Sequence, residues 1–100
     1  MIRHDVMFKF KPFNSEEEKS LRLNKIKNEL EGLISVISYL KDLRVSFNIN
    51  PNEEWDILLE TELDSMEDVI RYGKEPAHVE IVKSLIRPIL ENRACIDHMV

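Results

Sequence analysis

The chain has 100 residues, of which 43% are hydrophobic and 33% are charged, a balance that excludes an intrinsically disordered segment. So short a chain is too small for two ordinary domains, and residues 1–100 are expected to form a single one. Acidic residues outnumber basic ones by 19 to 14, and the net charge of -5 argues against a nucleic acid as the partner.

A β-strand is expected at residues 2–10, where apolar and polar side chains alternate. Pro12 ends the pattern, because proline cannot donate a hydrogen bond to a neighbouring strand. The strand therefore has one mainly apolar face for a core and one polar face. The first face carries Ile2, His4, Val6, Phe8 and Phe10, and the second carries Arg3, Asp5, Met7 and Lys9.

A helix is expected from about residue 16. Ser15 and Glu18 have the spacing of a capping box, and acidic residues in the first turn favour a helix start. Gly32 is expected to end the helix in a left-handed conformation. Apolar residues at three- and four-residue spacing predict one buried stripe on this helix, formed by Leu23, Ile26, Leu30 and Leu33.

Two further strands are expected, from about residue 40 to residue 47 and over residues 55–63. Both show alternating apolar and polar side chains, and the Asn-rich segment 48–52 between them predicts a turn. Residues 33–40 are ambiguous, since their apolar spacing suits either a short helical turn or the approach to the strand.

A second helical region is expected to begin at Ser65, which Asp68 follows three positions later. Gly73 is expected to interrupt it, and Pro76 to open a second piece. After Pro88, residues 94–100 are strand-like. The order β-α-β-β-α-β predicts an α+β, ferredoxin-like split βαβ unit, in which a four-stranded antiparallel sheet carries both helices on one face.

The other face of such a sheet has no helices to cover it. Met7 and Leu58, with some of Leu40, Ile96 and Val100, are expected there among charged residues. A solvated surface is one interpretation. We expect instead the interface of a homodimer, in which opposite charges pair across a two-fold axis, because closed dimers are the commonest oligomers.

Several segments, in this order and at this spacing, resemble the stress-responsive dimeric A/B barrel family. The resemblance covers essentially the whole chain and implies a ferredoxin-like unit whose sheet packs against that of a second copy to form a dimeric α/β barrel. The segments are Ile2 to Lys11, Ser15 to Lys19, Glu62 to Asp68, Tyr72 with Pro76-Ala77-His78-Val79, and Asp97.

The family includes a polyketide cyclase, which folds a linear poly-β-keto acid by an intramolecular aldol condensation between sheet and helices. The resemblance implies that His78 and Tyr72 act as acid and base, that His4 faces the same cavity, and that Asp97 orients a histidine. Members commonly read His-Pro-Ala-His, whereas this chain has Glu75 in the first position. Alternation alone leaves open whether Asp97 or His98 faces the cavity.

The position of His78 in the first turn of an expected helix disfavours its protonated form, so a neutral imidazole is available as a base. A packing or capping role is the competing interpretation for this residue and for Tyr72. A cavity that binds a small hydrophobic or keto-containing molecule is expected to be lined by Val6, Phe8, Leu23, Ile57, Leu59 and Val82.

No metal ion and no cofactor are expected. Three scattered histidines and one cysteine show no metal-ligand spacing, and two glycines form no phosphate-binding loop. Cys95 lies between apolar residues and is expected to be an inert, buried thiol. A single cysteine, no membrane-spanning apolar run and no signal-peptide pattern favour the cytoplasm, with no membrane partner.

Two functions are compatible with this sequence. The first is an acid-base enzyme or ligand-binding protein, and the alternative is a non-catalytic stress-response or structural dimer. A cavity of about 300 Å³ or more that reaches His78 and Tyr72 favours the first, whereas side chains that fill this space favour the second.

Overall fold

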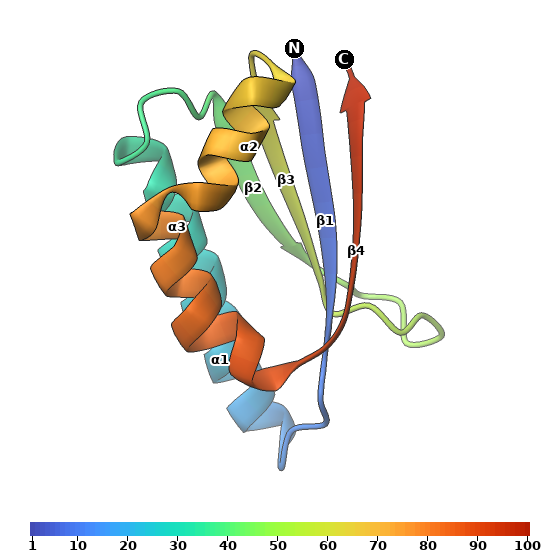
Figure 1. Ribbon diagram of the computed structural model, residues 1–100. Helices are drawn as coiled ribbons and strands as arrows, with labels where there is room; N and C mark the ends of the chain where they lie inside the picture. Colours follow the sequence, from blue (N-terminus) through green and yellow to red (C-terminus); the bar gives the residue numbers. More distant parts are fainter.

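A computed structural model describes residues 1–100 as a four-stranded sheet with all of the helices on one face (Figure 1). The strand order is β2-β3-β1-β4, and each neighbouring pair is antiparallel. The predicted ferredoxin-like α+β fold is therefore confirmed. The strands are β1 (Ile2–Phe10), β2 (Asp42–Phe47), β3 (Ile57–Leu63) and β4 (Leu90–Met99).

Two serine caps begin the main helices where the sequence predicts them. The Oγ atom of Ser15 accepts a hydrogen bond from the Glu18 amide at 3.0 Å, and Ser65 accepts one from the Asp68 amide at 3.2 Å. The helices are α1 (Glu16–Glu31), α2 (Met66–Lys74) and α3 (Pro76–Ile81), with a 3₁₀ turn η1 (Gly32–Ser35), a π turn η2 (Val82–Ile86) and a 3₁₀ turn η3 (Arg87–Ile89).

The two glycines do not have the roles that the sequence predicts. Gly32 has φ -63° and leads directly into η1, so the predicted left-handed helix stop is wrong. Gly73 lies inside α2, and the break between α2 and α3 falls at Glu75, whose φ of -64° and ψ of 123° are extended. The residue before a proline is forced out of the helical region, so Pro76 causes the break.

The edges of the sheet also differ from the prediction. Strand β4 starts at Leu90 rather than at residue 94, because its pairing with β1 extends to Leu90 opposite Phe10, past an irregularity at Lys9 and Phe10. Strand β3 starts at Ile57, two residues later than expected. Leu40, expected as a candidate for the uncovered face, is 4% exposed and belongs to the core.

The core fills the space between the sheet and the helices. Its residues come from alternate positions of the strands and from one stripe of each helix, as the periodicity predicts. Side chains that are completely covered include Ile26, Leu30, Leu63 and Ile86. Strand β1 lies between β3 and β4, so its inward-facing side chains meet both the core and the segment α2–α3.

Candidate functional site

A cavity of about 310 Å³ separates strand β1 from the helical segment α2–η2. Its wall is mostly apolar, and the polar side chains in it are two histidines, one tyrosine and two arginines. Its volume lies in the range of small-molecule sites. The lining residues are His4, Val6, Phe8, Leu59, Tyr72, Gly73, His78, Val82, Ile86, Arg87, Leu90 and Arg93.

The break at Pro76 brings Tyr72 and His78 together. Tyr72 is on the buried side of α2, with 1% of its surface exposed, and His78 is in the first turn of α3. Their ring centroids lie 4.2 Å apart with the planes tilted by 35°. The ring of His4 meets Tyr72 edge-on, with a centroid separation of 6.4 Å. Three of the four predicted catalytic side chains thus line the same cavity.

Two polar atoms of this group are buried and lack a hydrogen-bond partner in the protein. They are the Oη atom of Tyr72 and the Nδ1 atom of His78. Buried polar groups are nearly always paired, and leaving one unpaired costs about 1–3 kcal/mol. A pair of such atoms in residues that line a cavity is the pattern expected where a bound molecule supplies the missing partners.

Burial sets the protonation states of both groups. Burial, together with smaller effects of the nearby His4 and Arg93, lowers the pKa of His78 to about 4, so the imidazole is neutral at pH 7. Burial raises the pKa of Tyr72 well above its ordinary value of 10, so its hydroxyl keeps its proton. The site therefore combines a neutral imidazole with a phenolic donor.

Asp97, and not His98, faces the helices beside His4. The register pairs His4 with Asp97, and His4 Nδ1 lies 2.5 Å from Asp97 Oδ1. His98 is on the opposite face, where its Nε2 lies 2.9 Å from Asp5 Oδ2. The carboxylate of Asp97 orients His4 and fixes its tautomer, while no carboxylate binds His78.

Cys95 does not have the buried position that its apolar neighbours predict. Its side chain is exposed, because β4 is an edge strand. Its Sγ atom lies 3.5 Å from Nδ1 of His4 and 4.0 Å from Oδ2 of Asp97. The expected buried thiol is therefore wrong, and the thiol lies next to the His4–Asp97 pair.

Four of the six expected lining residues, Val6, Phe8, Leu59 and Val82, belong to the cavity wall. Leu23 on α1 lies in the core outside this wall, and Ile57 on β3 lines a different hollow.

Two lining residues, Arg87 and Arg93, are not expected from the sequence. Both are cationic, and no acidic residue lines the cavity. The spacing of Arg93 to Cys95 and Asp97 puts all three on one side of β4, which is the one sequence signal for Arg93.

Comparison with known proteins places the chain in a family. The model of the stress responsive A/B barrel domain matches residues 2–100. The chain belongs to the stress responsive A/B barrel family. The resemblance inferred from the sequence is confirmed over nearly its whole length.

Solved structures agree with this assignment. A dimeric protein of unknown function from Bacteroides fragilis is 35% identical, with a TM-score of 0.91, over 99% of this chain and 95% of that one. An A/B barrel family protein from Mesorhizobium loti is 25% identical, with a TM-score of 0.75, over 99% and 95%. A hydroxynitrile lyase from Passiflora edulis, 16% identical with a TM-score of 0.79 over 99% and 92%, shares the fold.

No curated protein matches the chain in sequence. None of the helices of this A/B barrel protein has the length and apolar character that a bilayer crossing requires.

Glu75, which stands where the resemblance implies a histidine, contacts the segment after η1. The Oη atom of Tyr39 donates a hydrogen bond to Glu75 Oε2 at 2.8 Å. The guanidinium of Arg71 lies 4.0 Å from the centroid of the Tyr39 ring. This contact ties the break between α2 and α3 to the segment after η1, and Glu75 is not among the residues that line the cavity.

Proposed function

We propose that this A/B barrel protein binds a small carbonyl compound with an anionic group and transfers protons on it. The observation that carries this proposal is the pair of unpartnered buried atoms, Tyr72 Oη and His78 Nδ1, in residues that line a cavity of about 310 Å³. A structural dimer that binds no small molecule needs neither an open cavity nor buried polar groups without partners.

The residues have distinct roles in this proposal. The neutral imidazole of His78 accepts a proton from the carbon next to the ligand carbonyl, and the Tyr72 hydroxyl donates a hydrogen bond to the enolate oxygen that forms. Arg87 and Arg93 attract the anionic group of the ligand. His4, fixed by Asp97, assists from the opposite wall.

The low pKa of His78 makes it a weak base in the empty cavity. An anionic ligand reverses part of this effect, because a negative charge near the imidazole favours its protonated form. Binding and base strength are therefore coupled, and a keto acid is a better candidate than a neutral ketone. The hydroxynitrile lyase of Passiflora edulis supports only the general point that this fold is compatible with catalysis on a small molecule.

The experiment is a histidine NMR titration of the wild-type protein with and without a mixture of small keto acids and aromatic acids. We expect a ligand to raise the pKa of His78 from about 4, and we expect no ligand-induced change in the chemical shift of His98, whose ring contacts Asp5 on the opposite face. Arg93→Gln is expected to reduce this response. If none of the acids changes the titration of His78, the proposal is contradicted and the alternative, a non-catalytic dimer, is favoured.

Several structural neighbours are dimeric. We propose a homodimer for this chain through the face of the sheet that the helices leave uncovered. Arg3 Nε and Asp5 Oδ1 on this face form an ion pair at 3.8 Å but are buried without a hydrogen bond, and Arg3 lies 3.4 Å from Glu60 and 3.8 Å from Glu62. A second copy can supply the missing partners.

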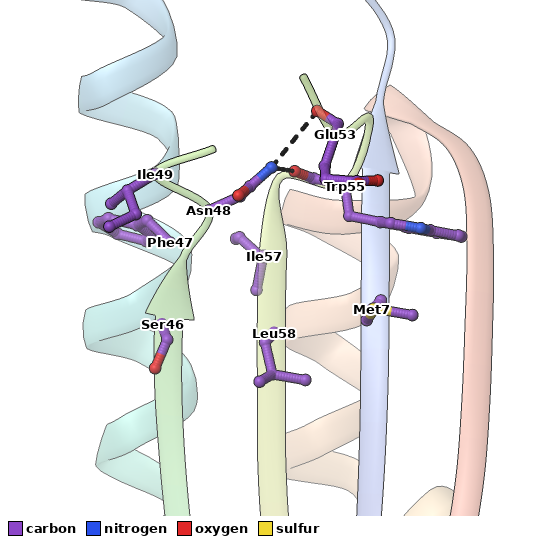
Figure 2. Close-up of a pocket in the computed structure, with 9 residues that line it drawn as sticks. All are labelled: Met7, Ser46, Phe47, Asn48, Ile49, Glu53, Trp55, Ile57 and Leu58. Atoms are coloured by element: carbon purple, nitrogen blue, oxygen red, sulfur yellow. Dashed lines mark hydrogen bonds between the residues drawn. The ribbon is translucent and has the colours of Figure 1, made fainter. Parts of the chain in front are cut away.

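The apolar part of this face supports the same interface. A hollow of about 440 Å³ lies where the end of the sheet meets the loop before β3, and Figure 2 shows Met7, Leu58 and Trp55 around it. Asn48 holds the loop in place, since its side-chain amide donates to the Trp55 carbonyl at 2.7 Å. Ile96, 63% exposed on β4, extends the apolar surface to the other edge.

A further inference from the structure

A cluster of metal-ligating atoms lies on the helix-facing side of β1 and β4, beside the cavity. The register pairs His4 with Asp97 and Val6 with Cys95, so His4, Cys95 and Asp97 are on the same face. The imidazole nitrogen, the thiol sulfur and a carboxylate oxygen all lie within 4.8 Å of one another. The spacing of Cys95 and Asp97 puts both on one face of β4, but no local signal indicates that His4 joins them, because it lies more than 90 positions away in the sequence.

We propose that His4, Cys95 and Asp97 form a three-residue site for a divalent transition metal of the Zn²⁺ type. Imidazole nitrogen, thiolate sulfur and carboxylate oxygen are the three ligand types that Zn²⁺ takes in proteins. A thiolate and a carboxylate together neutralise the charge of the dication. The sulfur ligand argues against Mg²⁺ and Ca²⁺, which bind through oxygen.

One of the three separations matches a tetrahedral centre, and the other two require side-chain movement: Cys95 Sγ and Asp97 Oδ2 lie 4.0 Å apart and must approach by about 0.4 Å. Sγ of Cys95 and Nδ1 of His4 are 3.5 Å apart, against about 3.6 Å for ligands on a tetrahedral zinc ion. The separation of 2.5 Å between His4 Nδ1 and Asp97 Oδ1 is that of a hydrogen bond, and must widen by about 0.8 Å. Asp97 is exposed on an edge strand, so rotation of its side chain supplies this movement.

Three protein ligands leave the fourth position of the metal to water, as in catalytic rather than structural zinc sites. His4 also belongs to the cavity wall, so the metal lies at the edge of the cavity. The metal site shares His4 and Asp97 with the proposed acid-base function, but its ligand atoms are different from His78 Nδ1 and Tyr72 Oη, so the titration of His78 tests that function separately.

The test is a Co²⁺ titration of the reduced full chain, followed by absorption spectroscopy. We expect one equivalent per chain and a near-ultraviolet thiolate-to-cobalt charge-transfer band that Zn²⁺ abolishes by displacement. Cys95→Ser should remove the band. His4→Gln and Asp97→Asn should each weaken binding at least about tenfold, since even the loss of an outer partner of a metal ligand does so. The matched control His98→Gln should bind as the wild type does.

Three outcomes would overturn the site: no charge-transfer band in the wild type, unchanged affinity in Cys95→Ser, or half an equivalent per chain in a metal-bridged larger species. Circular dichroism establishes that each variant is folded. If His4→Gln unfolds, Asp97→Asn decides, because its exposed side chain can change without loss of core packing. The keto-acid titration of His78 is run in the presence of a chelator, so failure of one proposal is distinguishable from failure of the other.

Discussion

At the scale of single residues, this protein buries polar side-chain atoms that have no hydrogen-bond partner. The hydroxyl of Tyr72 is buried without a partner, whereas that of Tyr39 donates to Glu75 at 2.8 Å. Both pKa values are raised, chiefly by burial, yet only Tyr39 has a hydrogen bond in return. We propose on this contrast that the Tyr72 hydroxyl is available to a ligand, whereas the Tyr39 hydroxyl is bound within the protein.

Tyr72→Phe is expected to leave the free energy of unfolding unchanged or slightly higher, because it removes a buried group that has no partner. The same variant should bind keto acids more weakly, by about tenfold, if the hydroxyl donates to the ligand. Tyr39→Phe is the matched control and should lose about 1 kcal/mol of stability with little change in ligand affinity. Urea unfolding and ligand titration measure both quantities, and a marked destabilisation of Tyr72→Phe would contradict the assignment.

The pKa of His78 makes stability depend on pH. In the folded chain it is about 4, below the ordinary value of 6.5, so the unfolded chain takes up this proton first as the pH falls. Stability is therefore expected to decrease as the pH falls from about 6.5 to 4, and to be insensitive to this residue above that window. His78→Asn should flatten the decrease in urea unfolding curves recorded across the window. Identical profiles for wild type and His78→Asn would show that the imidazole is not buried in the folded chain.

At the scale of secondary structure, local signals in the chain decide where the helices begin. Ser15 and Ser65 each accept a hydrogen bond from the amide three residues later, and each is followed by acidic side chains in the first turn. The end of α1 depends on the path of the chain beyond it, since Gly32 continues into η1. Both helix starts are therefore local in origin, whereas the end of α1 depends on where the chain goes next.

Ser15→Ala and Ser65→Ala are each expected to cost about 1 kcal/mol, because each leaves a first-turn amide without its side-chain acceptor. Ser84→Ala is the control, since the Ser84 hydroxyl donates to the Glu80 carbonyl within a helical segment and caps no helix start. The comparison is made by thermal or urea unfolding. Equal losses in all three variants would argue that the caps contribute nothing specific.

At the scale of the whole molecule, the helices cover one side of the sheet, and the other side remains free (Figure 1). The free side mixes charged residues with Met7, Leu58 and Ile96. A four-stranded sheet with one open, partly apolar face is suited to association with a second copy, as in the dimeric neighbours.

Leu58→Asp is expected to convert the dimer into monomers, because it places an uncompensated charge in the apolar centre of the proposed interface. Leu21→Asp is the matched control, since Leu21 is 68% exposed on α1, away from this face. Sedimentation or light scattering at several protein concentrations distinguishes the two. A Leu58→Asp protein that remains dimeric would place the interface elsewhere.

The sequence by itself determined the order of elements, the helix starts and the division of each strand into an inner and an outer face, because these depend on patterns of a few residues. It also placed His4, Tyr72 and His78 on the helix side through resemblance to a family. Tertiary structure decided whether Asp97 or His98 meets His4, that Arg93 enters the cavity and that Cys95 joins the His4–Asp97 pair. These relations depend on the register between β1 and β4, which joins residues about 90 positions apart and leaves no trace in local spacing.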